Sequence, residues 1–193
     1  TVFMTDAIGF NALAVAFLML GARIFDALND PIMGSIVDRT RTKWGKCRPY
    51  MKWMAFPIAI MTAICFLPWY PQSDGGFAAI SVMYVVWGMI YTVADVPYWG
   101  LSTAMSNDTY RRGNLLTIAR LFCTAGAGIV TVITPIITDN MTKGLDPVAK
   151  GEMLKWIYFV IAIVCCVIAV PLFFLGFKNT TERNISTENP PSL

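Results

Sequence analysis

RIFDALNDPIMGSIVDRTRTKWGKCRP, residues 23–49, decides the fold of this chain because its first half places charged side chains within a long apolar segment. Asp26, Asn29 and Asp30 follow a run that is mostly Ala, Leu, Phe, Val and Gly. On a helix these three side chains share one face, and Arg23 lies one turn earlier on the same side. An ionisable side chain at the bilayer centre costs about 2.5–3.5 kcal/mol on insertion scales, so this cluster indicates an ion or substrate site inside a helical bundle.

The overall composition is that of a membrane protein. The chain has 193 residues, of which 56% are hydrophobic and 14% are charged, whereas ordinary soluble domains are about 25% charged. Its net charge of +3 is small and its basic residues lie in loops beside apolar stretches, which favours membrane topology over nucleic-acid binding. Histidine is absent, so a His-ligated metal site and a Ser/His/Asp triad are both excluded within this chain.

Five apolar stretches are long enough to predict membrane-spanning helices, after a first segment, residues 1–9, that resembles the end of another helix. They cover residues 13–37, 53–69, 77–104, 115–138 and 154–177. The loop from Arg39 to Lys52 carries six basic residues and no acid, and Arg111 and Arg112 follow the third stretch. The other loops lack this excess of basic residues, so the positive-inside rule predicts Thr1 outside and Leu193 in the cytoplasm. We therefore expect an all-α, multi-pass protein of the cell membrane.

A second group of polar side chains lies within the stretch 77–104. Gly88, Thr92, Asp95 and Trp99 follow one another at helical spacing and form one stripe, which Tyr91 borders. A carboxylate accepts hydrogen bonds from neighbouring sugar hydroxyls, and an indole ring packs against the apolar face of a pyranose. The stripe therefore suggests a sugar site.

Arg120, alone in the next apolar stretch, could donate to further hydroxyls or neutralise Asp95. Purely structural roles are the alternatives. Asp95 and Arg120 could pair only to hold two helices together, and Trp99 could belong to the aromatic belt at the membrane interface. A structural role fits Asp26 and Asp30 less well, because two carboxylates one turn apart repel unless a cation or proton lies between them.

Two long motifs give a specific resemblance. The first is DALNDPIMG at residues 26–34 with RTKWGK at 41–46, and the second is WGMIYTVADVPYW at 87–99. In register, they resemble the signature of the glycoside-pentoside-hexuronide:cation symporters. That family is a branch of the major facilitator superfamily, in which twelve helices in two halves alternate access and move one cation with each sugar.

The resemblance covers the whole chain and implies helices two to six of such a helical bundle. Residues 1–177 would form part of an N-terminal six-helix domain, and the polar segment 178–193 would be a cytoplasmic linker. The first helix and the C-terminal half would then be partners supplied by the rest of the transporter. The loop at residues 39–52 resembles the gating loop of the superfamily.

The resemblance also implies roles for individual residues. The cation ligands would be Asp26, Asn29, Asp30 and Thr92. The sugar contacts would be Asp95, Trp99 and Arg120, with Arg23 and Tyr91 nearby. No cofactor is expected, and the coupling cation would be Na⁺, with H⁺ or Li⁺ as alternatives.

Three other functions are alternatives. A related symporter for a non-sugar amphipathic substrate, such as a lysolipid, would keep the cation motif, and a non-transporting membrane scaffold would need neither site. An intramembrane aspartyl protease using Asp26 and Asp95 is disfavoured, because neither residue lies in a Gly-x-Gly-Asp sequence. We therefore do not expect an enzyme.

Overall fold

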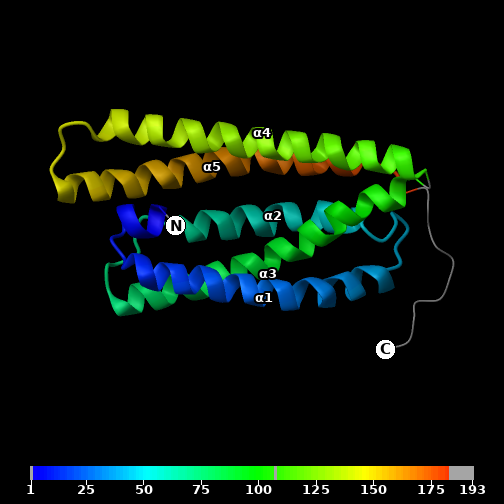
Figure 1. Cartoon of the computed structure of the whole chain (residues 1–193), viewed down its shortest axis with the longest axis horizontal. Helices are drawn as coiled ribbons and strands as arrows, with labels where there is room; N and C mark the ends of the chain where they lie inside the picture. The colour runs from blue at the N-terminus through cyan, green and yellow to red at the C-terminus, as the bar shows by residue number, and fades with distance from the viewer. Residues whose placement is uncertain (1, 107, 183–193) are drawn as a thin grey trace.

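The computed structural model describes residues 2–106 and 108–182, and all regular elements in these ranges are helices. A short π-helical turn, η1 (Phe3–Ala7), precedes the five long helices. These are α1 (Ala12–Arg39), α2 (Arg48–Cys65), α3 (Asp74–Met105), α4 (Thr109–Thr142) and α5 (Pro147–Asn179). The five helices run lengthwise through the molecule with their connections at two opposite ends (Figure 1). The predicted all-α fold is confirmed.

Four of the helices, α1, α3, α4 and α5, are long and apolar enough to cross a membrane. They are also poorly buried by the rest of the described chain, because no more than 17% of the most apolar window of any of them is buried. α2 is the shortest of the five helices, with 18 residues, and packs against α3 and α5 in the same bundle. Helices with so much exposed apolar surface fit a hydrocarbon environment.

α2 begins earlier and ends earlier than the predicted stretch 53–69. It covers Arg48–Cys65, so Arg48 and Lys52 lie in its first turns rather than in the preceding loop. Pro49 suits the first turn of a helix, where its missing N–H is not needed. The helix ends before Pro68, which disfavours helical backbone at the residue that precedes it.

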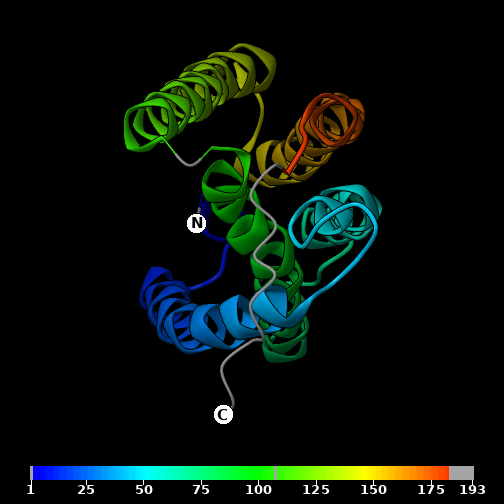
Figure 2. The same ribbon diagram turned by 90° about the vertical axis from the view of Figure 1, so that its right-hand side faces the viewer.

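α3 occupies the centre of the bundle when it is viewed along its length (Figure 2). It contacts α1, α2 and α4, whereas α1 packs only against α3 and η1 within the described chain. Two apolar clusters hold α1, α2, α3 and α5 together, one near each end. The first includes Phe3, Val15, Ile80 and Leu154, and the second includes Met33, Val37, Cys47, Met51 and Leu101.

The outer face of α1 is apolar along its whole length. Its exposed side chains recur at helical spacing: Leu13, Phe17, Leu20, Ile24, Leu28, Ile32 and Ile36. This stripe is suited to lipid or to another apolar helix. Asp26 and Asp30 lie away from this stripe, on the side of α1 that faces α3, so they avoid the lipid-facing side as the sequence predicted.

The basic segments gather at one end of the bundle. The loop between α1 and α2, the connection between α3 and α4, and the end of α5 all lie at this end (Figure 1). Asp108 caps α4 by accepting a hydrogen bond from the N–H of Tyr110 at 2.9 Å, so Arg111 and Arg112 lie in the first turn of α4. α5 continues to Asn179, two residues past the predicted boundary, and the predicted linker beyond Glu182 lies outside the described residues.

Candidate functional site

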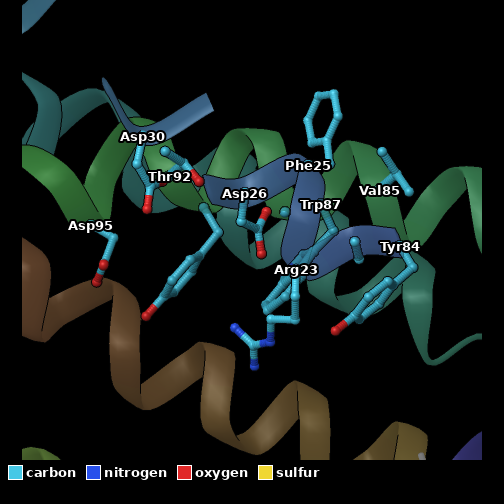
Figure 3. A pocket seen from close by; sticks show the side chains of 12 residues that line it. Arg23, Phe25, Asp26, Asp30, Tyr84, Val85, Trp87, Thr92 and Asp95 are labelled. Atoms are coloured by element: carbon cyan, nitrogen blue, oxygen red, sulfur yellow. The ribbon is translucent and has the colours of Figure 1, made fainter. Parts of the chain in front are cut away.

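A polar pocket of about 320 Å³ opens between α1 and α3. α1 contributes Ala22, Arg23, Phe25, Asp26 and Asp30. α3 contributes Tyr84, Val85, Trp87, Gly88, Tyr91, Thr92 and Asp95. The two motifs that the sequence singled out therefore face each other across one pocket (Figure 3).

Gly88 allows the two helices to approach closely at this point. A β-carbon added to Gly88 would lie 3.3 Å from the Oδ1 atom of Asp26, which is tighter than an ordinary contact. A larger residue at position 88 would therefore push against the carboxylate of Asp26. One turn farther along α3, Thr92 is only 5% exposed and lines the same pocket.

Three of the four predicted cation ligands lie together. Asp26, Asp30 and Thr92 line the pocket, and the carboxyl groups of Asp26, Asp30 and Asp95 project to the same side (Figure 3). Asn29 does not line the pocket and is partly buried. In the part of the chain that the structure describes, no three acidic or thiol groups come close enough to form a metal site by themselves. Neutral oxygens such as the hydroxyl of Thr92 would have to complete a cation site.

The pocket lining carries more acidic than basic side chains. It contains three carboxylates, Asp26, Asp30 and Asp95, and a single cationic side chain, Arg23. None of these four groups takes part in the ion pairs formed by residues 2–106 and 108–182. A pocket with two uncompensated negative charges attracts cations.

The predicted substrate residues form a second, connected arrangement. The indole Nε1 of Trp99 donates a hydrogen bond to Oδ1 of Asp95 at 3.1 Å. The guanidinium of Arg120, from α4, lies 4.2 Å from the centre of the Trp99 ring, a cation–π contact. Trp99 and Arg120 do not line the pocket, whereas Asp95 belongs to both arrangements.

Two features of this geometry bear on the structural alternatives for Asp95, Trp99 and Arg120. Among the described residues, Asp95 and Arg120 form no direct ion pair, and each of them contacts Trp99. Trp99 is half-buried and hydrogen-bonded within the bundle, which differs from a residue that only anchors a helix at the interface.

Three aromatic rings lie in a row beside the acids, and of these the sequence pattern singled out only Tyr91. The rings of Tyr84, Trp87 and Tyr91 stack in order, with centroid distances of 5.8 Å and 5.3 Å. Trp87 is fixed from α2, because its Nε1 donates to Oγ1 of Thr62 at 2.9 Å. Extending the polar stripe one turn toward the start of α3 would have identified Tyr84, whereas Phe25 carries no sequence signal beyond being apolar.

Comparison with known proteins identifies the kind of molecule that carries this pocket. The family described as MFS/sugar transport protein matches residues 1–192. The chain belongs to this family. Its members are transporters and not enzymes, and the four apolar helices of the described chain fit a multi-pass membrane protein. The resemblance to glycoside-pentoside-hexuronide:cation symporters is confirmed.

Individual relatives cover nearly the whole chain. The isoprimeverose transporter of Lactiplantibacillus pentosus is 32% identical over 99% of the chain, and the inner membrane symporter YicJ of Escherichia coli is 34% identical over 98%. A glucuronide carrier protein homolog of Escherichia coli is 29% identical over 99%. The chain spans about two fifths of the length of these relatives, 39% for the first two and 40% for the third.

Proposed function

We propose that this chain is part of a secondary transporter that couples the uptake of a sugar, namely a glycoside, pentoside or hexuronide, to a monovalent cation. Na⁺ is the proposed cation. The observation that carries the proposal is the shared position of Asp95, which lines the acidic pocket and also accepts the hydrogen bond from Trp99. One carboxylate thus connects a candidate cation site to a candidate sugar site.

The proposed cation site uses Asp26, Asp30 and Thr92, with Asn29 adjoining on α1. Carboxylate and hydroxyl oxygens are the ligands that hard cations prefer. The excess of negative charge in the pocket supports this assignment, because a bound monovalent cation would offset part of it. Arg23, the cationic group of the lining, would limit the number of cations held at once.

The proposed sugar site uses Asp95, Trp99 and Arg120, with Tyr91 and Arg23 nearby. The Trp99 ring contacts Arg120 on one face, and its edge donates to Asp95. This leaves further oxygen lone pairs of Asp95 and further N–H groups of Arg120 for sugar hydroxyls. The related proteins whose names mention isoprimeverose, glucuronide or lactose support a carbohydrate substrate.

The proposed orientation places the basic end of the bundle in the cytoplasm. The end of α1, the loop after it, the first turns of α2 and α4 and the end of α5 meet at this end, and they carry nine of the 15 basic residues of the chain. The positive-inside rule assigns such an end to the cytoplasm. The first helix and the C-terminal half of the transporter would complete the cavity from the other side.

A counterflow assay on the complete protein tests the function. Proteoliposomes loaded with unlabelled sugar are diluted into labelled glycosides, pentosides and hexuronides, with Na⁺, Li⁺ or only K⁺ present, at two pH values. We expect exchange of at least one carbohydrate class to rise with Na⁺. Exchange that responds only to pH would assign H⁺ instead. Exchange of a lysolipid but of no sugar would favour a non-sugar symporter, and exchange of nothing would favour a scaffold.

A further inference from the structure

The carboxylate of Glu182 makes an unusual long-range contact at the basic end of the bundle. Its Oε1 accepts hydrogen bonds from the backbone N–H groups of Cys47 and Arg48, and its Oε2 accepts one from Lys46, each at 2.8 Å. The N–H of Arg48 opens α2 and the other two belong to the residues just before it, at the helix N-terminus, where a helix has no internal acceptors for its N–H groups. A negative charge at this position is also stabilised by the helix dipole.

The loop is shaped to receive this carboxylate. Gly45 has a φ of +104°, in the left-handed region that favours glycine. A β-carbon at position 45 would overlap the carboxylate of Glu182. Next to the contact lies a hollow of about 250 Å³ lined by loop residues and by Glu182, so the carboxylate is held by the backbone rather than packed in a core.

The end of α5 reinforces the contact. The Arg48 guanidinium donates to the backbone oxygen of Phe177 at 2.7 Å and lies 4.8 Å from the centre of its ring. The Nζ of Lys52 lies 4.9 Å from the centre of the Trp44 ring and 5.6 Å from that of Phe177. The segment from Phe177 to Glu182 therefore contacts both the loop and the first turns of α2.

We propose that Glu182 is a latch, which holds the loop of residues 40–47 against the end of α5, and that its release frees the loop and exposes Cys47. The loop follows directly from α1, the helix that carries Asp26 and Asp30, so the latch also fixes the basic end of that helix. Glu182 accepts hydrogen bonds from three consecutive backbone N–H groups, and Trp44 of the loop also packs edge-on against Phe177 with ring centroids 6.0 Å apart, so the loop is attached to the end of α5 through both its backbone and a side chain.

Cys47 is a built-in reporter of the latch. Its side chain is 1% exposed, and its own N–H is bound by Glu182. Cys65, at the opposite end of α2, is also buried but lies far along the helix from the latch. The two thiols of one molecule therefore distinguish a local opening from a general loss of structure.

The test measures alkylation of both thiols by N-ethylmaleimide in the complete protein in membrane vesicles, with peptide-level mass spectrometry as the readout. The variants are Glu182→Ala, which removes the carboxylate, and Glu182→Gln, which keeps its shape but loses its charge. Glu152→Gln is the matched control, because this exposed carboxylate pairs only with Lys155 at 2.8 Å on the same helix. We expect Cys47 to react at least tenfold faster in Glu182→Ala and to a lesser degree in Glu182→Gln, with Cys65 unchanged.

Three results would contradict the proposal that Glu182 is a latch. An unchanged Cys47 rate in Glu182→Ala would show that the loop is held by other contacts. An equal rise for Cys65 would show that Glu182 stabilises the whole bundle rather than the loop. A similar rise in Glu152→Gln would show that any lost carboxylate has this effect.

Discussion

The proposed function gives Asp30 a role in cation binding and Asp95 a role in sugar binding, and this difference can be tested directly. Both carboxylates line the pocket, and replacing either by Asn removes one negative charge from it while keeping nearly the same shape. If the pocket acted only through its total charge, Asp30→Asn and Asp95→Asn would have the same effect. The proposed roles predict different effects.

In Asp95→Asn the main loss is in sugar binding. Asp95 already accepts the Trp99 hydrogen bond at 3.1 Å, and the amide has only one oxygen to serve Trp99 and the sugar hydroxyls together. A hydrogen bond to a charged group contributes about 1.5–3 kcal/mol, so sugar affinity should fall roughly 10- to 150-fold. Na⁺ binding should remain measurable, because Asp26 and Asp30 are still present.

In Asp30→Asn the main loss is in cation coupling. Na⁺ should no longer raise sugar affinity, and sugar should bind as it does to the unaltered protein without Na⁺. Because coupling energies between sites are typically about 1–3 kcal/mol, sugar affinity in saturating Na⁺ should be about 5- to 150-fold weaker than in the unaltered protein.

Isothermal titration calorimetry of the complete protein checks both effects, with Na⁺ titrated alone and sugar titrated with and without Na⁺. Asp74→Asn, at the start of α3 and far along the helix from the pocket, is the matched control for a lost carboxylate. Equal effects of Asp30→Asn and Asp95→Asn on Na⁺ and sugar binding would show that the pocket acts only through its total charge. If Asp95→Asn lost Na⁺ binding and kept its sugar affinity, the proposed roles would be reversed.

Three further predictions concern the basic end of the bundle. Single cysteines at positions 74 and 143, at the proposed outer end, should react with an impermeant maleimide added to intact cells, whereas cysteines at positions 43 and 111, at the proposed inner end, should not. Labelling at either inner position would refute the orientation. Gly45→Ala should speed alkylation of Cys47 as Glu182→Ala does, because a β-carbon overlaps the carboxylate at a φ of +104°, whereas Gly113→Ala, with open space around it, should not. Burial, reinforced by the charge of Glu182, raises the pKa of the Cys47 thiol from 9.0 to about 12, so its alkylation rate should keep rising about tenfold per pH unit from pH 8 to 10; a plateau above pH 9 would show that the thiol reacts from an opened loop.

Helical periodicity predicted the two polar faces that line the pocket. The spacing of Asp26 and Asp30 on one helix, and of Gly88, Thr92 and Asp95 on another, placed these residues on stripes that the structure brings face to face. Charge within an apolar helix is a strong signal, because such residues must avoid lipid. The packing of one helix against another depends on the tertiary structure, so the sequence alone could not show that Asp95 shares a pocket with Asp26.

The sequence could not predict contacts in which charged or polar residues, expected in loops by composition, bind parts of the chain that are distant in sequence. The charge of Arg48 and Lys52 predicts a loop, yet both residues lie in the first turns of α2. There the Arg48 guanidinium packs on Phe177, and the Lys52 amine lies over Trp44 and Phe177. Glu182 lies in a polar segment that resembles a linker, and its partners lie more than a hundred positions earlier in the chain. No local pattern encodes a contact of this length.

Asp95 also gives a physical reason for coupling within the proposed function. With the pocket empty of cation, the carboxylates of Asp26, Asp30 and Asp95 line one small space and repel one another. A cation held by Asp26 and Asp30 would offset this repulsion and attract the Asp95 carboxylate, which would hold it in place as an acceptor for sugar hydroxyls. A sugar bound to Asp95 would in turn favour the arrangement that holds the cation, since coupling between two bound ligands is reciprocal. Neither ligand needs to touch the other, because the carboxylate between them responds to both.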